Sequence, residues 1–449
     1  MEPQPQGRAT LAPRVGLAAI LIVYSALASV QSFATRLQWG PDEPAHIIYV
    51  QSLALDGRFP KLAYSVQDNV YVPGASRSHQ AQHPPLYYML AAPVWRAFSA
   101  RPVQTVSYVD KQSAESHRFS VPGAVRPVRL VSVVLGAVTL LFAWWTARTV
   151  FPGRPVVWLG SAALTAFTPM FTYVSGVINN DALLGVVFAA TAWRWARAVR
   201  FGAGARDLAI LGVLLGIGLN VKETALGLAA VSVVVLGIEP GARSLGQRVA
   251  RTALVLGLTA GLGGCWFVRK WLVYGSPFVY PFHYPLLGLP EPERFALMCA
   301  MPARILMSTF VPIDVVMGYA NMHLVYGFFA GLVVLSAVGV GAVLVRRERH
   351  GVARYEAQSL VLWLLAGAVV LGGLVRNLLL VDWRMGTSGG RLLVCVLPLA
   401  AMASARGIGV LLGDGKWTSV GLAAICVLML GVNVYAIWAT AAQYGTLGW

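Results

Sequence analysis

From residue 129 to the C-terminus, the sequence alternates between long apolar segments and short turns rich in Arg and Lys. Charged residues make up only 12% of the chain, hydrophobic residues make up 57%, and the mean hydropathy is +0.65. Water-soluble globular domains do not have this composition, whereas proteins that cross a membrane many times do. We therefore predict an all-α polytopic membrane protein whose residues 1–449 form a single transmembrane domain.

The apolar segments predict about eleven spans. Two of them, 208–219 and 225–238, are shorter than the roughly 20 residues of a comfortable span, and we interpret them as short helices that meet at a polar outer hinge. The first segment could also be a signal peptide, with Ala26-Leu27-Ala28 as its cleavage site, but the many later segments favour a retained helix. The predicted spans are 15–30, 131–147, 156–174, 182–198, 208–219, 225–238, 253–268, 323–345, 360–380, 392–403 and 419–439.

The net charge of +17 could indicate nucleic-acid binding, but most of the cations collect in one set of turns. In a membrane protein such turns lie on the inner face and meet anionic lipid, so we expect membrane lipid and no nucleic acid as a partner. The turns near Arg154, Arg200, Arg248 and Arg347 are therefore predicted to lie inside, together with the N-terminus. The four cysteines are scattered, and their positions indicate neither a metal site nor a disulfide framework.

Two polar stretches, 34–127 and 274–321, are predicted to be extracytoplasmic loops. The first contains Trp39-Gly40-Pro41-Asp42-Glu43-Pro44-Ala45-His46, and the apolar positions that follow recur at helical spacing. This pattern predicts a juxtamembrane helix that ends near Gly57, on which Asp42 and His46 would share one face. We expect no separate soluble C-terminal domain after the last span.

Acidic and imidazole groups at the outer ends of the spans are candidates for a site. Asp42 and Glu43 place two carboxylates at the mouth of an apolar protein, although they could simply cap a helix. His46 and His83 could bind a divalent metal with Asp42, but their spacing favours hydrogen bonds to substrate or loop. Asp181 suits either a polar contact to substrate or metal, or a helix cap.

Three cations, Lys222, Arg269 and Arg391, map to the outer boundary in the predicted topology. Such charges are costly there without a counter-charge, which a phosphate would supply. The alternatives are that Lys222 pairs with Glu223 and that the other two are interfacial anchors. Anchoring is less favoured for Arg391, because Gly389-Gly390 lets a backbone approach closely.

Several of these motifs together resemble the GT-C-type membrane glycosyltransferases, and above all a group of bacterial membrane proteins related to protein O-mannosyltransferases. The resemblance is spread over most of the chain, and its first two motifs are the specific ones. The matching pieces are Pro41-Asp42-Glu43-Pro44-Ala45-His46, His83-Pro84-Pro85-Leu86-Tyr87-Tyr88, Asn180-Asp181, Lys222-Glu223-Thr224, and Gly390-Arg391 leading to Leu397-Pro398.

The resemblance implies a GT-C-like bundle in the bacterial inner (plasma) membrane, with an outward-facing active site. In this superfamily an acidic residue of the first outer loop is catalytic, and the donor is a polyprenyl-phosphate-linked sugar. We expect inverting transfer to a glycan, lipid or protein acceptor of the cell envelope, with Asp42 as general base and Glu43 as second carboxylate. His46, His83, Asp181, Lys222, Arg269 and Arg391 are the expected substrate-binding residues.

No cofactor is certain from the sequence, and a divalent metal stays open. Two other functions compete with glycosyl transfer. A transporter or flippase of lipid-linked sugars would be expected to carry ionisable groups in mid-span and repeated halves, and the sequence has no such repeat. A non-catalytic envelope-assembly protein would not require the acidic pair beside the first span.

Overall fold

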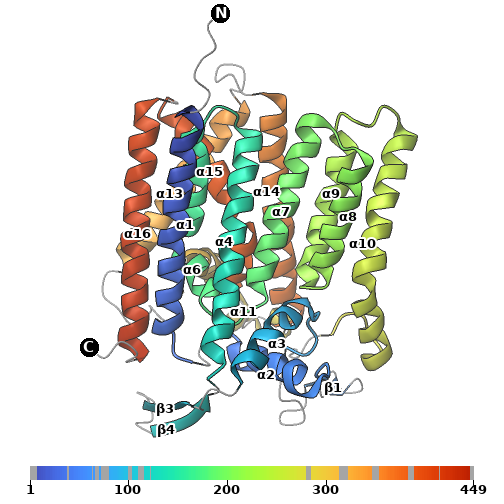
Figure 1. Cartoon of the computed structure of the whole chain (residues 1–449), viewed down its shortest axis with the longest axis vertical. Coiled ribbons are helices and arrows are strands. Elements are labelled where there is room, and N and C mark those ends of the chain that lie inside the picture. Colours follow the sequence, from blue (N-terminus) through green and yellow to red (C-terminus); the bar gives the residue numbers. More distant parts are fainter. Residues whose placement is uncertain are drawn as a thin grey trace, which may run out of the picture.

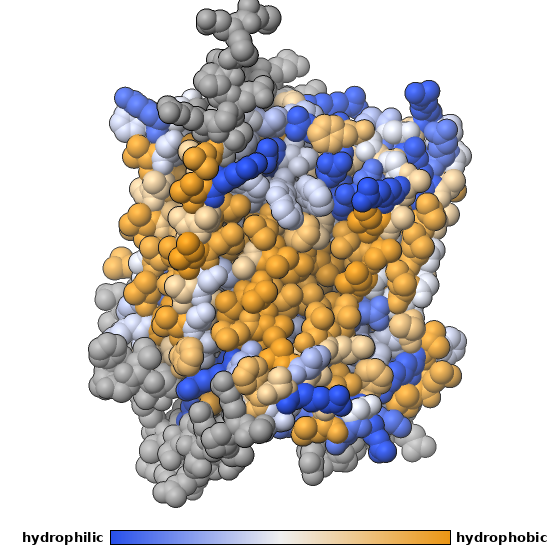
Figure 2. Space-filling view, viewed as in Figure 1, coloured by the Kyte–Doolittle hydropathy of each residue, from blue (hydrophilic) through white to orange (hydrophobic). Residues whose placement is uncertain are grey.

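The computed structural model describes residues 8–37, 40–62, 64–65, 70–71, 80–99, 104–109, 116–121, 123–279, 285–312, 322–345, 353–382, 389–413 and 415–444. Most helices run roughly parallel to one another in a bundle, and short helices and two hairpins cover one end (Figure 1). The first helix of the chain begins at the opposite end (Figure 1). On the face seen in Figure 2, apolar side chains cover the middle of the bundle, and polar side chains gather at both ends. This distribution is that of an integral membrane protein.

Eight helices in the described ranges are long and apolar enough to cross a membrane, and a bent pair raises this number to nine. The eight are α1 (Arg8–Ala34), α4 (Val125–Val150), α7 (Asp181–Phe201), α10 (Leu245–Tyr274), α13 (Met322–Val345), α14 (Arg354–Leu380), η5 (Gly389–Val396) continued by α15 (Leu397–Leu411), and α16 (Lys416–Tyr444). The prediction of about eleven spans exceeds this number because it counted α8 (Ala205–Leu219) and α9 (Leu226–Ile238), which have only 15 and 13 residues.

The bent pair consists of α5 (Pro155–Ala166) and α6 (Pro169–Ser175), which meet at 62° where one continuous segment was predicted. Pro169 disfavours helical backbone at the residue before it, and Thr168 is accordingly extended. Asn433 of α16 satisfies the break, since its Nδ2 donates to Phe167 O at 3.2 Å and its Oδ1 accepts from Thr172 Oγ1 at 3.1 Å. The bend leads the chain into the 176–180 turn, which precedes α7.

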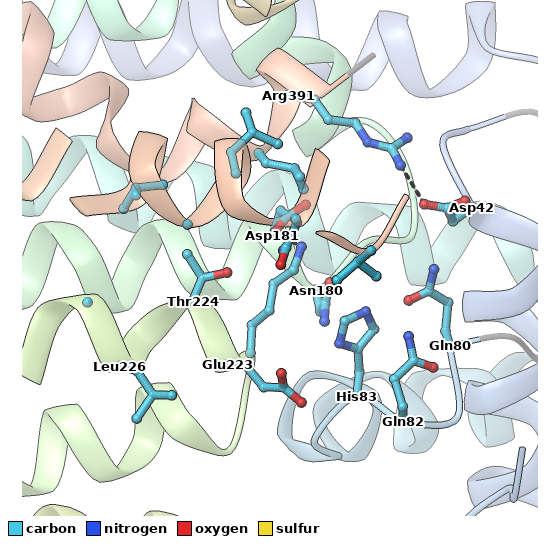
Figure 3. A pocket seen from close by; sticks show the side chains of 18 of the residues that line it. Asp42, Gln80, Gln82, His83, Asn180, Asp181, Glu223, Thr224, Leu226 and Arg391 are labelled. Carbon is cyan, nitrogen blue, oxygen red and sulfur yellow. Dashed lines mark hydrogen bonds and ion pairs between the residues drawn. The ribbon is translucent and has the colours of Figure 1, made fainter. Parts of the chain in front are cut away.

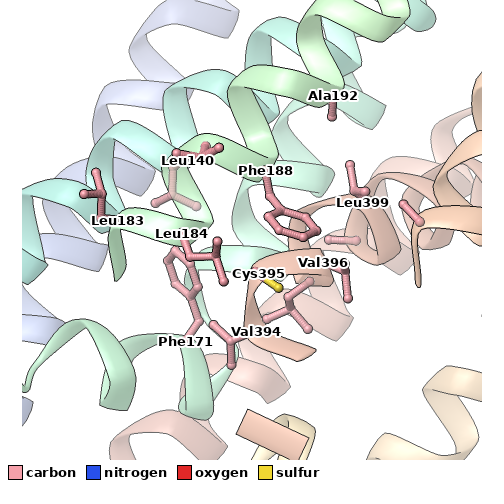
Figure 4. Close-up of a cluster of buried hydrophobic side chains, with 14 of the residues drawn as sticks. Leu140, Phe171, Leu183, Leu184, Phe188, Ala192, Val394, Cys395, Val396 and Leu399 are labelled. Carbon is pink, nitrogen blue, oxygen red and sulfur yellow. The ribbon is translucent and has the colours of Figure 1, made fainter. Parts of the chain in front are cut away.

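The centre of the bundle is a cluster of buried hydrophobic side chains from α4, α6, α7 and the η5–α15 segment. Leu184 and Phe188 of α7 lie against Val394 and Val396 of η5 (Figure 4). Burial of such side chains holds the short 3-10 helix η5 inside the bundle although its backbone is not α-helical. The elements that bear the site residues at their ends are therefore held in place by side-chain packing.

The connection between α1 and α4 forms the cap at one end of the bundle (Figure 1). It contains the predicted juxtamembrane helix as α2 (Glu43–Gln51), followed by one turn of π-helix (η1, Ser52–Asp56) that ends at Gly57 in a left-handed conformation. The helix expected after Pro84-Pro85 is α3 (Leu86–Phe98). Two antiparallel hairpins complete the described part of this connection: β1 (Tyr64–Ser65) with β2 (Val70–Tyr71), and β3 (Gln104–Val109) with β4 (Ser116–Val121).

The connection between α10 and α13 contains η3 (Leu286–Gly288) and a 20-residue helix, α11 (Glu291–Phe310), that the sequence analysis did not predict. Buried Met301 and Ile305 of α11 pack against Leu374 and Leu378 of α14. This contact places α11 beside the end of α14 that reaches the candidate site.

Candidate functional site

A cavity of about 860 Å³ lies where the α1–α4 connection meets the ends of the bundle helices. Its polar wall comes from α2, the 80–83 loop, the 176–181 turn and η2 (Glu223–Ala225), and its apolar wall comes mainly from α9 and α14. The lining residues are Asp42, His46, Gln80, Gln82, His83, Asn179, Asn180, Asp181, Lys222, Glu223, Thr224, Leu226, Gly227, Phe278, Val279, Val369, Val370, Gly373, Leu374, Arg376, Asn377, Val381, Asp382, Arg391 and Leu392.

Asp42 lies at the N-terminus of α2 with φ 57°, a left-handed conformation that no other non-glycine residue adopts in the described ranges. Its side chain makes no capping hydrogen bond to the helix. Its Oδ2 lies 2.5 Å from Nη2 of Arg391, across the cavity (Figure 3). Strained backbone of this kind persists where surrounding structure imposes it, and it is common at functional sites.

Glu43 points the other way, into the bundle, and is completely buried. Its carboxylate accepts two hydrogen bonds from Arg129, at 2.7 and 2.6 Å, and one from the backbone N–H of Ile178 at 3.1 Å. The Arg129 guanidinium, also completely buried, donates to the carbonyl oxygens of Ser32, Thr35 and Arg36 at the end of α1. Glu43 therefore ties the start of α2 to α1, α4 and the 176–180 turn.

Two further ion pairs lie side by side at the polar wall. Lys222 Nζ is 2.6 Å from Oδ1 of Asp181, and the completely buried Lys270 of α10 pairs with Glu223. The alternative that Lys222 pairs with its neighbour Glu223 is therefore wrong. Lys222 has φ −162° and ψ 145°, an extended backbone in which successive side chains point in opposite directions.

Arg391 is the third residue of η5, and α11 fixes the backbone immediately before it. Gly390 N donates to Ser308 Oγ at 2.9 Å. A Cβ atom at Gly390 would overlap Ile305 O, Thr309 N and Ser308 Oγ, so only glycine permits this close approach. This contact fixes the distance between α11 and the start of η5. At that distance the side chain of Arg391 reaches Asp42.

The two histidines of the cavity have different surroundings. His46 Nδ1 lies 2.8 Å from the hydroxyl of Tyr88, which stacks on Tyr49 with ring centroids 3.8 Å apart. His83 belongs to the 80–83 loop, and burial together with nearby Lys222 lowers the pKa of its imidazole well below the usual 6.5, with smaller contributions from His46 and Lys270. His83 is accordingly neutral at physiological pH.

The sequence and the fold were compared with known proteins. Residues 123–262 match the family described as dolichyl-phosphate-mannose-protein mannosyltransferase (PMT_2). ArnT from Cupriavidus metallidurans bound to undecaprenyl phosphate has a TM-score of 0.52 at 13% identity, covering 96% of this chain and 74% of that one. The chain is therefore similar to membrane glycosyltransferases of the GT-C type, in the sequence of residues 123–262 and in its fold.

Two further solved structures are similar to this chain. The apo crystal structure of ArnT gives a TM-score of 0.51 at 13% identity, with 98% of this chain and 76% of that chain covered. The apo oligosaccharyltransferase of Archaeoglobus fulgidus gives 0.46 at 12% identity, with 95% and 55% covered. No curated protein sequence matches the chain. The resemblance to the polyprenyl-phosphate-sugar-dependent glycosyltransferases, expected from the motifs, is confirmed.

Six of the eight residues expected in the site line the cavity: Asp42, His46, His83, Asp181, Lys222 and Arg391. Glu43 and Arg269 are not among the lining residues. The Arg269 guanidinium lies 4.4 Å from the centroid of the Trp266 ring and 5.5 Å from that of Phe59, so it makes cation–π contacts with both rings, and its role as an interfacial anchor stays a prediction.

Other residues of the site were not predicted. Arg129 and Lys270 are completely buried cations whose carboxylate partners come from distant parts of the sequence. Gln82 belongs to a polar loop in front of a predicted helix, and Arg376 lies inside a predicted span. A charged residue within an apolar segment is a signal of function that sequence reasoning could have used for Arg376.

A metal site was left open by the sequence. Among the residues that the structure describes, no three His, Cys, Asp or Glu side chains come together as a metal cluster. His46 instead contacts Tyr88, and Asp42 contacts Arg391.

Proposed function

We propose that this chain is a GT-C enzyme that transfers a sugar from a polyprenyl-phosphate donor to an acceptor hydroxyl of the cell envelope, with inversion at the anomeric carbon and Asp42 as general base. The observation that carries the proposal is the composition of the cavity. Asp42, Arg391 and Lys222 share one space with the apolar wall of Val369, Val370 and Leu374. An amphiphilic substrate with an anionic head requires this combination.

The apolar wall supports a lipid-linked donor. Leu226 of α9 is 41% exposed and lies at the edge of the cavity together with Gly227 and Val369. A prenyl chain that lies between α9 and α14 would remain among apolar side chains, while its phosphate reaches the cations of the polar wall. ArnT, whose fold this chain shares, has been crystallised with undecaprenyl phosphate.

Arg391 and Lys222 are the residues that we assign to the donor phosphate. A guanidinium can make two parallel hydrogen bonds to phosphate, whereas an ammonium acts as a point charge. Both cations have a carboxylate partner, Asp42 and Asp181 respectively. A phosphate monoanion would therefore take the place of a carboxylate that already pairs with the cation. Neither cation is left without a counter-charge, either before or after the donor binds.

Asp42 is suited to take the proton of the acceptor hydroxyl. As Arg391 turns towards the phosphate, the Asp42 carboxylate becomes available to the acceptor. The acceptor oxygen attacks the anomeric carbon, its proton passes to Asp42, and the bond from that carbon to the phosphate oxygen breaks, releasing polyprenyl phosphate. Only a base on the face opposite the leaving group is required. Glu43, which forms an ion pair with Arg129, would position α2 and with it Asp42.

The proposed orientation places the cavity outside a bacterial inner (plasma) membrane. The N-terminal end of the bundle carries the basic turns before α5, after α7 and before α10, which the positive-inside rule assigns to the cytoplasm. Residues 34–127 and 274–321 would then form the two extracytoplasmic loops. If α8 and α9 also cross the bilayer as a short pair, the number of spans becomes the predicted eleven.

The experiment is transfer of a radiolabelled sugar from polyprenyl phosphate by the purified protein in detergent, without an energy source. Binding of sugar-free polyprenyl phosphate is measured in parallel for wild type, Arg391→Ala and Lys222→Ala. We expect each variant to bind at least about tenfold more weakly, since a hydrogen bond to a charged group contributes roughly 1.5–3 kcal/mol. Wild-type affinity in both variants would move the phosphate site elsewhere. Arg304→Ala, on the exposed side of α11, is the control.

A further inference from the structure

The 80–83 loop contributes three uncharged polar side chains to the cavity: Gln80, Gln82 and His83 (Figure 3). They face the space between Asp42 and Asp181 (Figure 3). None of the three is used in the proposed steps of proton transfer and phosphate binding. Their role in the site therefore needs a separate explanation.

The backbone of this loop is fixed from several sides. Trp266 Nε1 of α10 donates to Gln82 O at 3.0 Å, and the Tyr49 hydroxyl of α2 donates to His83 O at 3.1 Å. Leu86 N, at the start of α3, donates to Asn220 O at 3.0 Å. The loop therefore presents its side chains from a preorganised position, as recognition of a small rigid ligand requires.

Two polar atoms of the loop are buried without a hydrogen-bond partner. Among the described residues nothing lies within hydrogen-bonding reach of Gln82 Oε1 or His83 Nδ1. A buried polar atom that stays unpaired is costly, so such atoms at a cavity wall indicate a ligand that supplies the missing partners. An amide and a neutral imidazole are matched to hydroxyl groups, which both donate and accept.

The charge of the cavity limits what that ligand can be. Its walls carry four carboxylates, Asp42, Asp181, Glu223 and Asp382, against three cations, Lys222, Arg376 and Arg391, and Lys270 behind the wall neutralises Glu223. The donor phosphate adds a negative charge to this balanced set. A sugar carboxylate or phosphate would add a second one beside the uncharged loop, which is electrostatically unfavourable.

We propose that Gln82 and His83 are the residues that recognise the donor sugar, and that this sugar is neutral and rich in hydroxyl groups, such as a hexose, and is not a uronic acid or a phosphorylated sugar. The inference rests on the proposed function, because it assumes that the polyprenyl phosphate occupies the same cavity. Gln82 is thereby a residue that determines specificity, and His83 supplies the second contact to the sugar.

The test separates the sugar contact from the phosphate contact. Equilibrium binding to the purified protein is measured for three probes: sugar-free polyprenyl phosphate, polyprenyl-phosphate hexose and polyprenyl-phosphate hexuronic acid. We expect the hexose donor to bind more tightly than the sugar-free lipid, and the hexuronic acid donor to bind no more tightly than the sugar-free lipid. Gln82→Ala and His83→Ala should each weaken hexose-donor binding by about tenfold while leaving sugar-free lipid binding within about twofold.

Two controls complete the design. His83→Gln keeps a neutral hydrogen-bonding side chain and should recover part of the loss, whereas Gln358→Ala, near the other end of α14, should change neither affinity. Equal losses for sugar-free and sugar-bearing lipid in the loop variants would overturn the inference, as would tighter binding of the hexuronic acid donor. If wild type fails to bind sugar-free polyprenyl phosphate at all, the proposed function itself fails.

Discussion

Asp42 Oδ2 and Arg391 Nη2 lie 2.5 Å apart although 349 positions separate the two residues in the chain. One carboxylate thus comes from the first connection after α1, and its partner from the segment that leads into α15. The side chains are 37% and 18% exposed, so both are accessible from the cavity. The pair provides the first prediction.

Asp42→Asn should lower sugar transfer by about a hundred- to ten-thousand-fold, the range that general-base catalysis contributes. Asn tolerates the left-handed backbone of this position as well as Asp does, so the local fold should persist. Donor binding should remain measurable. Turnover near that of wild type would exclude Asp42 as the base. Asp207→Asn, at the other end of the bundle, provides a carboxylate control.

Glu43→Gln should destabilise the protein, because it leaves the completely buried Arg129 guanidinium without its counter-charge. Breaking a buried pair in this way costs about 3–5 kcal/mol, which thermal unfolding in detergent would detect. The matched control is Glu291→Gln: Glu291 is 87% exposed and 3.5 Å from Arg294, and exposed pairs contribute little. A melting temperature equal to that of wild type would contradict the positioning role.

Gly390→Ala should reduce transfer by at least about tenfold, because the added Cβ forces η5 away from α11 and moves Arg391. Gly372→Ala is the control, since nothing lies within 4 Å of a Cβ at that position. The affinity for polyprenyl phosphate should fall together with turnover in Gly390→Ala. An unchanged affinity would show that Arg391 does not depend on this contact.

The pKa of His83 is lowered well below 6.5, which predicts that the protein becomes less stable at acidic pH. Below pH 6.5 the unfolded chain binds a proton at this position and the folded protein does not, so the free energy of unfolding falls as the pH falls towards the folded-state pKa. Wild type should therefore lose more thermal stability between pH 7.5 and pH 5 than His83→Gln does. His323→Gln, which removes an exposed histidine, should retain the wild-type response. An equal loss of thermal stability in wild type and His83→Gln would contradict the lowered pKa of His83.

The topology can be tested with two exposed leucines. In a chain from which the exposed Cys265 and Cys299 have been removed, Leu55→Cys and Leu245→Cys report on opposite ends of the bundle. An impermeant thiol reagent should label position 55 on intact cells and position 245 only after permeabilisation. The reverse pattern would invert the proposed orientation.

The sequence predicted the fold class, because hydropathy and turn charges are local properties. It also predicted α2 and α3, whose proline and glycine boundaries are local signals. It missed α11, which lies in a stretch where prolines and charges interrupt the apolar pattern. The break between α5 and α6 was also missed, although Pro169 is a signal that could have located it.

The pairing of charges could not be predicted in the same way. Adjacent residues such as Asp42 and Glu43, or Lys222 and Glu223, look like natural partners in a sequence. The backbone is left-handed at Asp42 and extended at Lys222. The side chains of Asp42 and Glu43 therefore point in different directions and pair with different residues, and so do those of Lys222 and Glu223. These partners are set by the tertiary packing of α1, α4, α7 and α10, which no local pattern encodes.

The long separation between Asp42 and Arg391 also bears on how the protein is made. The chain is synthesised and inserted from its N-terminus, and domains form as their segments emerge. Residue 42 leaves the ribosome early, but its partner follows only after α14 has been synthesised. A nascent or truncated chain that ends before η5 therefore lacks Arg391 and Leu392 of the cavity lining, and with Arg391 the cation that pairs with Asp42. The complete cavity is in this way formed only in molecules whose biosynthesis is almost finished.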